Sequence, residues 1–425
     1  MEKFDLAVIG AGPAGMIAAA RAGELGARVV LLDKNEKPGQ KLLLTGNKRC
    51  NLTKAEFDLS ALTEKFGKGG KFLFPAFNLF GPRQTMQFFE SRGLTLKVED
   101  QNKVFPASGR AADVLNILLG YLRQSRVEIL SGTEVIKIVA ENGRIEKLIT
   151  LSGEIAAKNI LIATGGKSYP QTGSDGRGYQ FLRELGHKIT TLRPGLVPIK
   201  VKEKWVHKLQ GLSVENVELS LLQNQKKLGT ESGDLIFTHF GLSGPAALDL
   251  SAKVSESLSR AQTKISVNFA PGMTLPELEG KILAVFSASQ NKMLKNCIDR
   301  LVPPRLALAL IQLAGMNPDK RVNLVSKPER QKIAALLNRV ELSVSGLLGF
   351  DQAMITTGGA ELKEIDPSSM NSKLIQNLFL AGEILNLQAP SGGYNLQLCW
   401  SSGYLAGNSV GSIFKGPVAQ ILIGG

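Results

Sequence analysis

A glycine-rich turn near the start of the chain restricts the possible folds more than any other feature. A buried strand (FDLAVIG) leads into the turn GAGPAG, an alanine-rich helix follows, and a second buried strand (ARVVLLD) ends at Asp33. Gly10, Gly12 and Gly15 suit a tight turn, close approach of the backbone to a pyrophosphate and close helix packing. Asp33 can accept hydrogen bonds from ribose hydroxyls, and the helix N-terminus adds N–H donors. The pattern predicts an α/β, Rossmann-like fold that binds a dinucleotide.

Only one such fingerprint is present. The later strand NILIATGG is not followed by a second GxGxxG. An enzyme with a separate nicotinamide domain beside a flavin domain would be expected to carry two. A single, tightly held FAD, reduced by a donor that docks elsewhere, therefore fits better than a plain NAD dehydrogenase.

Length and composition exclude several classes of protein. The chain has 425 residues, 43% of them apolar and 21% charged, as in folded globular proteins of more than one packed unit. No apolar run reaches the roughly 18 to 20 residues of a membrane span, and the first residues do not resemble a signal peptide. We expect a cytoplasmic protein with no membrane partner.

The cysteines indicate neither a disulfide framework nor a metal site. Cys50, Cys297 and Cys399 are widely spaced, and no Cys or His pair has zinc-ligand spacing. We therefore expect no bound metal.

The patterns along the chain suggest three stretches. Residues 127–163 read as an antiparallel meander feeding a buried strand, with Asn142-Gly143 favouring a type I′ hairpin. A Pro- and Gly-marked break at 191–199 leads to strand-like runs, and these give way to short helices. Ser326 and Glu329 have capping-box spacing, which predicts a helix start.

Positive charge is concentrated in one part of the chain. There are 51 Lys and Arg against 37 Asp and Glu, a net charge of +14. Residues 281–340 alone hold eleven basic and three acidic residues. This surplus fits either solvated helix faces or a surface for a polyanion such as nucleic acid.

Four blocks of the chain resemble the BaiN-like flavoproteins, also called aminoacetone-oxidase-like or NAD(P)/FAD-dependent oxidoreductases. The blocks are KPGQKLLLTGNKRCNLT (37–53), ATGGKSYPQTGSDGRGY (163–179), FTHFGLSGPAALDLS (237–251) and FLAGEILNLQAPSGGYNLQLCWSSG (379–403). The resemblance implies bound FAD and an FAD-binding domain that contains two insertions. The implied parts are FAD-binding residues 1–195, an inserted β-rich domain 196–274, an inserted basic helical subdomain 275–343, and FAD-binding residues 344–425.

The resemblance also implies which residues contact the cofactor. The ADP half would be held at the first turn by Gly10, Gly12, Pro13, Ala14, Gly15, Asp33 and Lys34. The flavin side would involve Arg49, Cys50, Asn51, Thr164, Gly165 and Gly166, and Lys41 would be a further cofactor-binding residue. The ribitol, pyrophosphate and last-helix contacts would be Gly382, Glu383, Gly392, Gly393, Tyr394, Asn395 and Leu396. Members of the family usually have Gly before Arg-Cys-Asn, whereas this chain has Lys48.

If the bound flavin transfers a hydride to a polarised C=C bond of the substrate, a carbanion-like centre is left on the substrate. A nearby acid must then protonate this centre. Cys50, His239 and Tyr394 are the titratable candidates within the blocks. Each also has a structural interpretation: Cys50 as a packing residue, His239 as a cap of the GLSG turn, and Tyr394 as support for the helix start.

The resemblance allows three functions. The first is reduction of the C5=C6 bond of a uridine in 23S ribosomal RNA to dihydrouridine, with NAD(P)H as electron source. RNA binding would use the positive charge, and the base would have to be unstructured or flipped out. The second is oxidation or reduction of a small steroid-like or amino-ketone metabolite. The third is a non-catalytic, FAD-containing RNA-binding protein.

Overall fold

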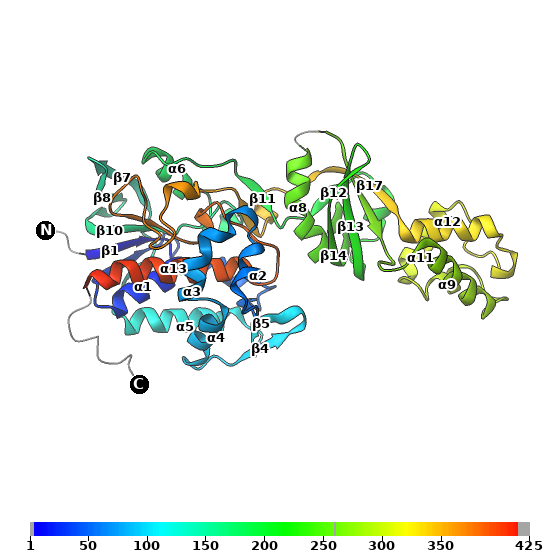
Figure 1. Cartoon of the computed structure of the whole chain (residues 1–425), viewed down its shortest axis with the longest axis horizontal. Coiled ribbons are helices and arrows are strands. Elements are labelled where there is room, and N and C mark those ends of the chain that lie inside the picture. Colours follow the sequence, from blue (N-terminus) through cyan, green and yellow to red (C-terminus); the bar gives the residue numbers. More distant parts are fainter. Residues whose placement is uncertain (1–3, 259–260, 415–425) are drawn as a thin grey trace. The chain divides into compact units, whose positions relative to one another are not determined.

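The computed structural model describes residues 4–258 and 261–414. The chain divides into two compact units (Figure 1). Unit 1 combines the chain up to Arg193 with the chain from Ile355 onward, and unit 2 is Pro194–Met354. Unit 2 is thus an insertion in the sequence of unit 1.

A parallel sheet forms the centre of unit 1. Its five strands lie in the order β19-β10-β1-β2-β6, and every neighbouring pair is parallel. Apolar residues on the inner strands are buried, as expected of a sheet covered on both faces. The strands are β1 (Phe4–Ile9), β2 (Val29–Leu32), β6 (Glu128–Leu130), β10 (Ala157–Ile162) and β19 (Leu378–Leu380). This arrangement confirms the predicted Rossmann-like α/β fold.

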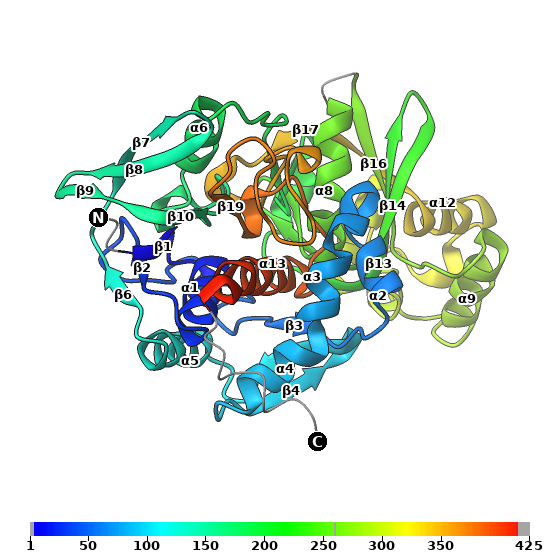
Figure 2. The same cartoon turned by 60° about the vertical axis from the view of Figure 1, so that its left-hand side comes forward.

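Helix α1 (Pro13–Glu24) packs against α13 (Tyr394–Gly411), from the opposite end of the chain, and against α5 (Ala111–Gln124). Figures 1 and 2 both show α13 alongside α1. The two backbones approach so closely because α13 places glycine every fourth residue on this face. A Cβ on Gly403 would lie 2.4 Å from the carbonyl oxygen of Ala14, and one on Gly407 would lie 2.3 Å from that of Ala18.

The rest of unit 1 surrounds this core. The meander is confirmed as the antiparallel sheet β7-β8-β9, and the positive φ values of Asn142 and Gly143 match the expected hairpin. The start of the predicted meander was wrong, because Glu128–Leu130 forms β6 of the parallel sheet. The remaining strands and α-helices are β3 (Thr53–Lys54), β4 (Leu96–Glu99), β5 (Lys103–Pro106), β7 (Val135–Glu141), β8 (Arg144–Thr150), β9 (Gly153–Ile155), α2 (Leu59–Glu64), α3 (Phe74–Leu79), α4 (Pro82–Glu90) and α6 (Arg177–Glu184).

Unit 2 contains a closed antiparallel barrel and a group of helices. The barrel order is β12-β15-β14-β13-β16-β17. Its strands are β12 (Ile199–Val201), β13 (Ser213–Gln223), β14 (Lys226–Thr238), β15 (Gly241–Ser243), β16 (Thr263–Asn268) and β17 (Val340–Leu347). The helices are α7 (Lys204–Lys208), α8 (Pro245–Leu258), α9 (Leu275–Ser287), α10 (Lys295–Ile298), α11 (Pro304–Leu313) and α12 (Lys327–Asn338).

Two features of unit 2 bear on the sequence interpretation. The capping box of α12 is confirmed, since Ser326 and Glu329 bond each other's backbone N–H groups. Strand β17 runs across residue 344, where the sequence placed the return to the FAD-binding part. Strands β11 (Arg193–Gly195) and β18 (Ile355–Thr357) form a separate two-stranded sheet.

A buried histidine makes the stability of unit 1 dependent on pH. His187 Nδ1 lies 3.0 Å from a carboxylate oxygen of Glu364, and Nε2 lies 2.9 Å from the Ser372 hydroxyl. That hydroxyl accepts two backbone N–H groups, so its hydrogen is free to be donated to Nε2. Burial lowers the pKa of His187 below its usual 6.5, despite the opposing effect of Glu364.

We therefore expect unit 1 to lose stability as the pH falls. Below about pH 6.5 the unfolded chain takes up a proton at His187 that the folded state binds less well. The free energy of unfolding should then fall by up to ~1.4 kcal/mol per pH unit from this group. Urea denaturation at pH 5 to 8 measures it, with His187→Gln as the comparison. The variant should have a lower free energy of unfolding than the wild type at pH 8, but this free energy should fall less between pH 8 and pH 5. An equal fall in both proteins would contradict the assignment of the pH dependence to His187.

Candidate functional site

The turn between β1 and α1 leaves no room for side chains at two of its glycines. A Cβ on Gly15 would lie 1.9 Å from the carbonyl oxygen of Gly10. One on Gly10, whose φ is +104°, would lie 2.6 Å from the carbonyl oxygen of Ala163 in the neighbouring segment. Asp33 follows β2, and its carboxylate accepts the backbone N–H of Ala11 at 2.7 Å. The acid and the turn are thus held together, as ribose and pyrophosphate recognition requires.

Gly12 differs from the other two glycines of this turn. Its φ of −80° and ψ of −177° are accessible to any residue, and nothing lies within 4 Å of a Cβ placed on it. Neither backbone conformation nor packing within the chain accounts for glycine here. Close approach of a ligand does account for it, so the open space at Gly12 fits the pyrophosphate of FAD.

The segment after β10 forms the neighbouring wall. Thr164 lies directly beside Gly10, but its hydroxyl faces Gly178 in α6. This hydroxyl oxygen is buried and has no hydrogen-bond partner among the described residues. Gly165 has a φ of +74°, and a Cβ on Gly166 would lie 2.3 Å from the Thr356 hydroxyl. These glycines therefore allow the chain to turn tightly against neighbouring segments.

A hydrogen-bonded ion pair fixes Glu383. Lys41 Nζ lies 2.6 Å from one carboxylate oxygen of Glu383 and 2.7 Å from the Ser168 hydroxyl. The other oxygen accepts the Ser168 hydroxyl at 3.0 Å and the Thr356 backbone N–H at 2.8 Å. Lys41 and Glu383 were expected at the site from the sequence, whereas Ser168 and Thr356 were missed. Ser168 does lie in the block 163–179, but no sequence pattern singles out Thr356.

The loop before β3 has an unusual backbone. Asn47, Lys48 and Cys50 all have positive φ, between +56° and +66°. Such values are uncommon for residues other than glycine, and they cluster at functional sites. The preference for Gly at the Lys48 position is explained by this conformation.

We expect Lys48→Gly to stabilise the protein. Lys48 has a φ of +66°, which glycine adopts without a Cβ penalty. The gain in free energy of unfolding should be about 1 kcal/mol, measured by urea denaturation. Lys48→Ala is the control, because alanine removes the charge but keeps the Cβ. A similar gain in both variants would assign the effect to charge instead.

The two residues after Lys48 are held differently. Arg49 donates to the Glu99 carboxylate at 2.5 Å, and its guanidinium lies 4.2 Å from the centre of the Phe105 ring. The hydrogen bond from Arg49 lowers the pKa of Glu99. Cys50 is completely buried, and burial raises the pKa of its thiol to about 12. The thiol is therefore neutral at physiological pH.

The start of α13 joins this loop. Gly393 has a φ of +99°, and a Cβ on it would lie 2.5 Å from the Thr53 backbone. With its amide oxygen turned toward Gly393, Asn51 accepts that N–H at 3.2 Å and donates to the carbonyl of Thr53 at 3.0 Å. Asn395 accepts the N–H of Ala389 at 3.0 Å and donates to its carbonyl at 2.8 Å. Asn51 and Asn395 thus shape the loops around the helix N-terminus.

The remaining predicted cofactor residues lie in the same unit. Pro13 and Ala14 open α1, and Gly382 packs closely against Ala14. Lys34 pairs with Asp175 at 2.6 Å. Gly392 has a φ of +116°, and Leu396 packs against the core.

Sequence reasoning missed two glutamines in the last block. The amide oxygen of Gln388 is buried and has no hydrogen-bond partner among the described residues, as expected where a polar ligand completes a site. Gln397 is fully buried and bonds Thr53, Thr85 and Ser401. Both glutamines lie in the block 379–403, which was the available signal.

The proposed proton donors fall in both units. Cys50 and Tyr394 lie in unit 1, where Tyr394 is 3% exposed and its ring centre lies 5.2 Å from Lys54 Nζ. His239 lies in unit 2, in the exposed turn between β14 and β15.

Within residues 4–258 and 261–414, no helix is both long and apolar enough to cross a membrane. The same residues contain no group of three or more His, Cys, Asp and Glu side chains placed to hold a metal ion.

The family model described as the HI0933-like protein Rossmann domain matches residues 4–409. The chain belongs to this family. The match confirms the resemblance found in the sequence, and together with the fold it makes the protein an FAD-dependent oxidoreductase.

Curated relatives of this family member cover almost its whole length. One is the 3-dehydro-bile acid delta(4,6)-reductase of Clostridium scindens, 29% identical over 410 residues, covering 95% of this chain and 98% of that protein. Another is the ribosomal RNA dihydrouridine synthase of Escherichia coli, 29% identical over 405 residues, covering 95% of this chain and 97% of that protein. The synthase of the same name from Haemophilus influenzae is 27% identical over 408 residues, with the same coverage.

Solved structures share the fold at low identity. The 3-ketosteroid-Δ4-(5α)-dehydrogenase of Rhodococcus jostii matches with a TM-score of 0.54 and 14% identity, covering 96% of each chain. The Escherichia coli quinol fumarate reductase subunit FrdA matches with a TM-score of 0.52 and 15% identity, covering 97% of this chain and 70% of that one. These likenesses concern the fold alone.

Proposed function

We propose that this protein reduces the C5=C6 bond of a uridine in 23S ribosomal RNA to dihydrouridine, with NAD(P)H as electron source. Two full-length relatives carry the name of ribosomal RNA dihydrouridine synthase. The observation that favours RNA over a small molecule is the net charge of +14. Each phosphate neutralised by Lys or Arg releases counterions and adds affinity, whereas a metabolite reductase gains nothing from the surplus.

Part of this charge is uncompensated on the surface of the helical part of unit 2. Among the described residues, no acidic side chain lies within ion-pair distance of six exposed cations there. These are Lys281, Lys292, Arg300, Arg321, Lys327 and Lys332. Lys295 and Lys320, by contrast, pair with Asp319 and Glu329. The helical part therefore supports the proposal of a polyanionic partner.

The residues of unit 1 have separable roles in the proposed reaction. FAD, when bound, would supply the hydride. The turn at Gly10 to Gly15 and Asp33 would hold its ADP half. The ion pair with Lys41 would neutralise the negative charge of the Glu383 carboxylate near the cofactor. The N-terminus of α13 would favour negative charge on the bound group, because its free N–H groups carry partial positive charge.

We propose Tyr394 as the acid that protonates C5. It lies directly after the Gly392-Gly393 turn, and Lys54 Nζ lies 5.2 Å from the centre of its ring. Cys50 is the weaker candidate, because burial raises the pKa of its thiol to about 12. Tyr394→Phe should slow dihydrouridine formation about 100-fold without slowing flavin reduction. A larger effect of Cys50→Ala or His239→Gln would move the assignment to that residue.

Ribosomal RNA from a strain lacking this protein tests the substrate. We expect one dihydrouridine of 23S RNA to be lost and to be restored by the purified protein with NADH or NADPH. Unchanged dihydrouridine would remove the RNA assignment and leave the flavoprotein assignment intact.

Reduction of a small conjugated ketone is the second candidate. It is favoured by the bile acid reductase, which is as similar to this chain as the Escherichia coli synthase. Rapid reoxidation of the reduced flavin by a 3-oxo-Δ4 steroid, with no RNA retained at low salt, would support it.

A further inference from the structure

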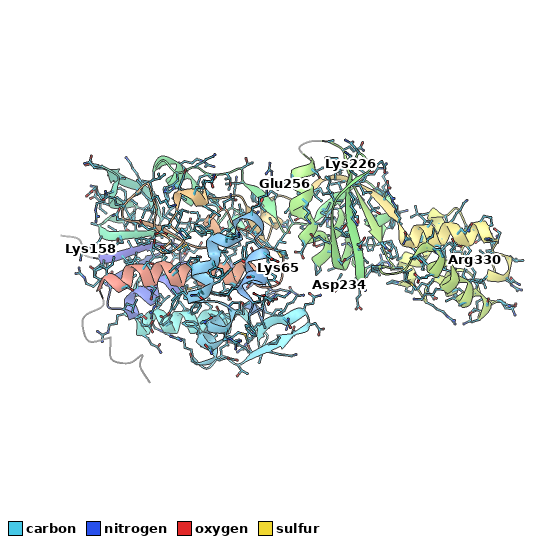
Figure 3. All side chains as sticks on the ribbon, viewed as in Figure 1. Lys65, Lys158, Lys226, Asp234, Glu256 and Arg330 are labelled. Carbon is cyan, nitrogen blue, oxygen red and sulfur yellow. The ribbon has the colours of Figure 1, made fainter. Side chains whose placement is uncertain are left out.

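An exposed stripe of three lysines and a phenylalanine runs along unit 1 at intervals of three residues. Lys65 ends α2, Lys68 and Lys71 lie in the 3₁₀-helix η2 (Gly67–Leu73), and Phe74 begins α3. Because a 3₁₀-helix has three residues per turn, Lys68 and Lys71 lie above one another within η2. Gly67, with a φ of +59°, turns the chain between Lys65 and this helix. All four are exposed, and Phe74 is 49% exposed. Figure 3 labels Lys65 at the end of α2.

The charge of this stripe is uncompensated. Among the described residues, no acidic side chain lies within ion-pair distance of Lys65, Lys68 or Lys71. Residues 59–89 contain a single acidic residue, Glu64, whose side chain is exposed. The lysines are therefore free to meet an anion without breaking an ion pair.

The stripe is anchored to the wall of the cofactor site. A Cβ on Gly69 would lie 2.8 Å from a methyl carbon of Leu387, which belongs to the segment leading to the Gly392-Gly393 turn. A Cβ on Gly70 would lie 1.9 Å from the carbonyl oxygen of Thr63. Helix α3 packs against α13. Gly69 thus lets η2 approach the segment before the Gly392-Gly393 turn, and Gly70 lets it approach α2.

We propose that this stripe binds single-stranded RNA next to the target uridine; the inference rests on the proposed function. Lys68 and Lys71 are one 3₁₀ turn apart, a rise of about 6 Å, which is comparable with the separation of consecutive phosphates in an extended strand. Lys65, Lys68 and Lys71 would contact these phosphates, and Phe74 would stack on a base. A single strand fits better than a duplex, because the target base must leave its stack to be reduced.

Salt-dependent RNA binding tests the stripe. The triple variant Lys65→Ala, Lys68→Ala, Lys71→Ala should bind a single-stranded oligonucleotide of the target region more weakly. The slope of log affinity against log salt should shrink by about 2, since each phosphate contact contributes about 0.7 for single strands. The matched control replaces three other exposed lysines of unit 1, Lys137, Lys188 and Lys363, by alanine. It should keep the wild-type slope.

Phe74→Leu separates stacking from charge. Leucine keeps an apolar side chain but removes the ring, so affinity should fall at least about five-fold with the slope unchanged. Flavin absorbance and the thermal midpoint of each variant report whether unit 1 is folded, and reduction by NAD(P)H should match the wild-type rate.

The possible failures are distinguishable. If the wild-type protein neither binds RNA nor forms dihydrouridine, the proposed function fails and the stripe proposal with it. If the wild-type protein does both and the stripe variant behaves like its control, the stripe proposal alone is overturned. The same holds if only substitutions at Lys281, Lys292 and Arg321 weaken binding, or if duplex RNA binds as tightly as a single strand.

Discussion

Gly407→Val is expected to reduce the free energy of unfolding of unit 1 by about 3 kcal/mol or more. The side chain would meet the backbone of Ala18 in α1, where even a Cβ lies 2.3 Å from the carbonyl oxygen. Backbone cannot move aside as a flexible side chain can, so α1 and α13 would have to separate. The urea midpoint of the purified protein measures the loss.

Gly120→Ala is the matched control for this prediction. Gly120 lies inside α5, and nothing is within 4 Å of a Cβ placed on it. Alanine should stabilise the helix there by about 0.5–1 kcal/mol. An unchanged urea midpoint in Gly407→Val would show that the two helices do not pack through glycine.

Gly12→Ala should lower FAD affinity about 100-fold while leaving the stability of the cofactor-free protein unchanged. The backbone conformation at Gly12 is open to alanine, and the protein itself leaves the space beside it free. A methyl group would therefore obstruct the pyrophosphate alone, at a cost of about 1–3 kcal/mol. Titration of the cofactor-free protein with FAD measures affinity, and thermal unfolding without FAD measures stability.

Gly15→Ala provides the contrast. Its Cβ would lie 1.9 Å from the carbonyl oxygen of Gly10, so the substitution should destabilise the protein even without FAD. Wild-type FAD affinity in Gly12→Ala would mean that the cofactor does not approach this turn. Equal loss of cofactor-free stability in both variants would mean that Gly12 has a packing role.

The fold was predictable where a local pattern determines it. The fingerprint from Phe4 to Asp33 predicted a strand, a turn, a helix and a parallel strand, and the Asn142-Gly143 hairpin follows from turn chemistry. The prediction of the meander was wrong for its first residues. Residues Glu128–Leu130 pair in parallel with β2, a long-range contact that alternation of apolar residues does not reveal.

The site was predictable only as a set of segments. The blocks located Lys41, Glu383 and the Gly393 turn, but hydrogen bonds between distant segments decide which partners they have. Thr356 was missed for this reason, since only the folded chain brings it to Glu383. At the loop before β3, the sequence showed that Lys48 departs from the Gly usual in the family, but it did not show why Gly is preferred there. The φ of +66° at Lys48 gives the physical reason.

The pairing of α1 with α13 has a consequence for biosynthesis. The alanine face of α1 leaves the ribosome early, whereas its glycine-bearing partner is translated after the whole of unit 2. The N-terminal part of unit 1 therefore keeps an uncovered apolar surface until α13 has been translated. Cofactor capture then becomes a late event, and chains truncated before Tyr394 should be substrates for chaperones and proteases rather than partly active flavoproteins.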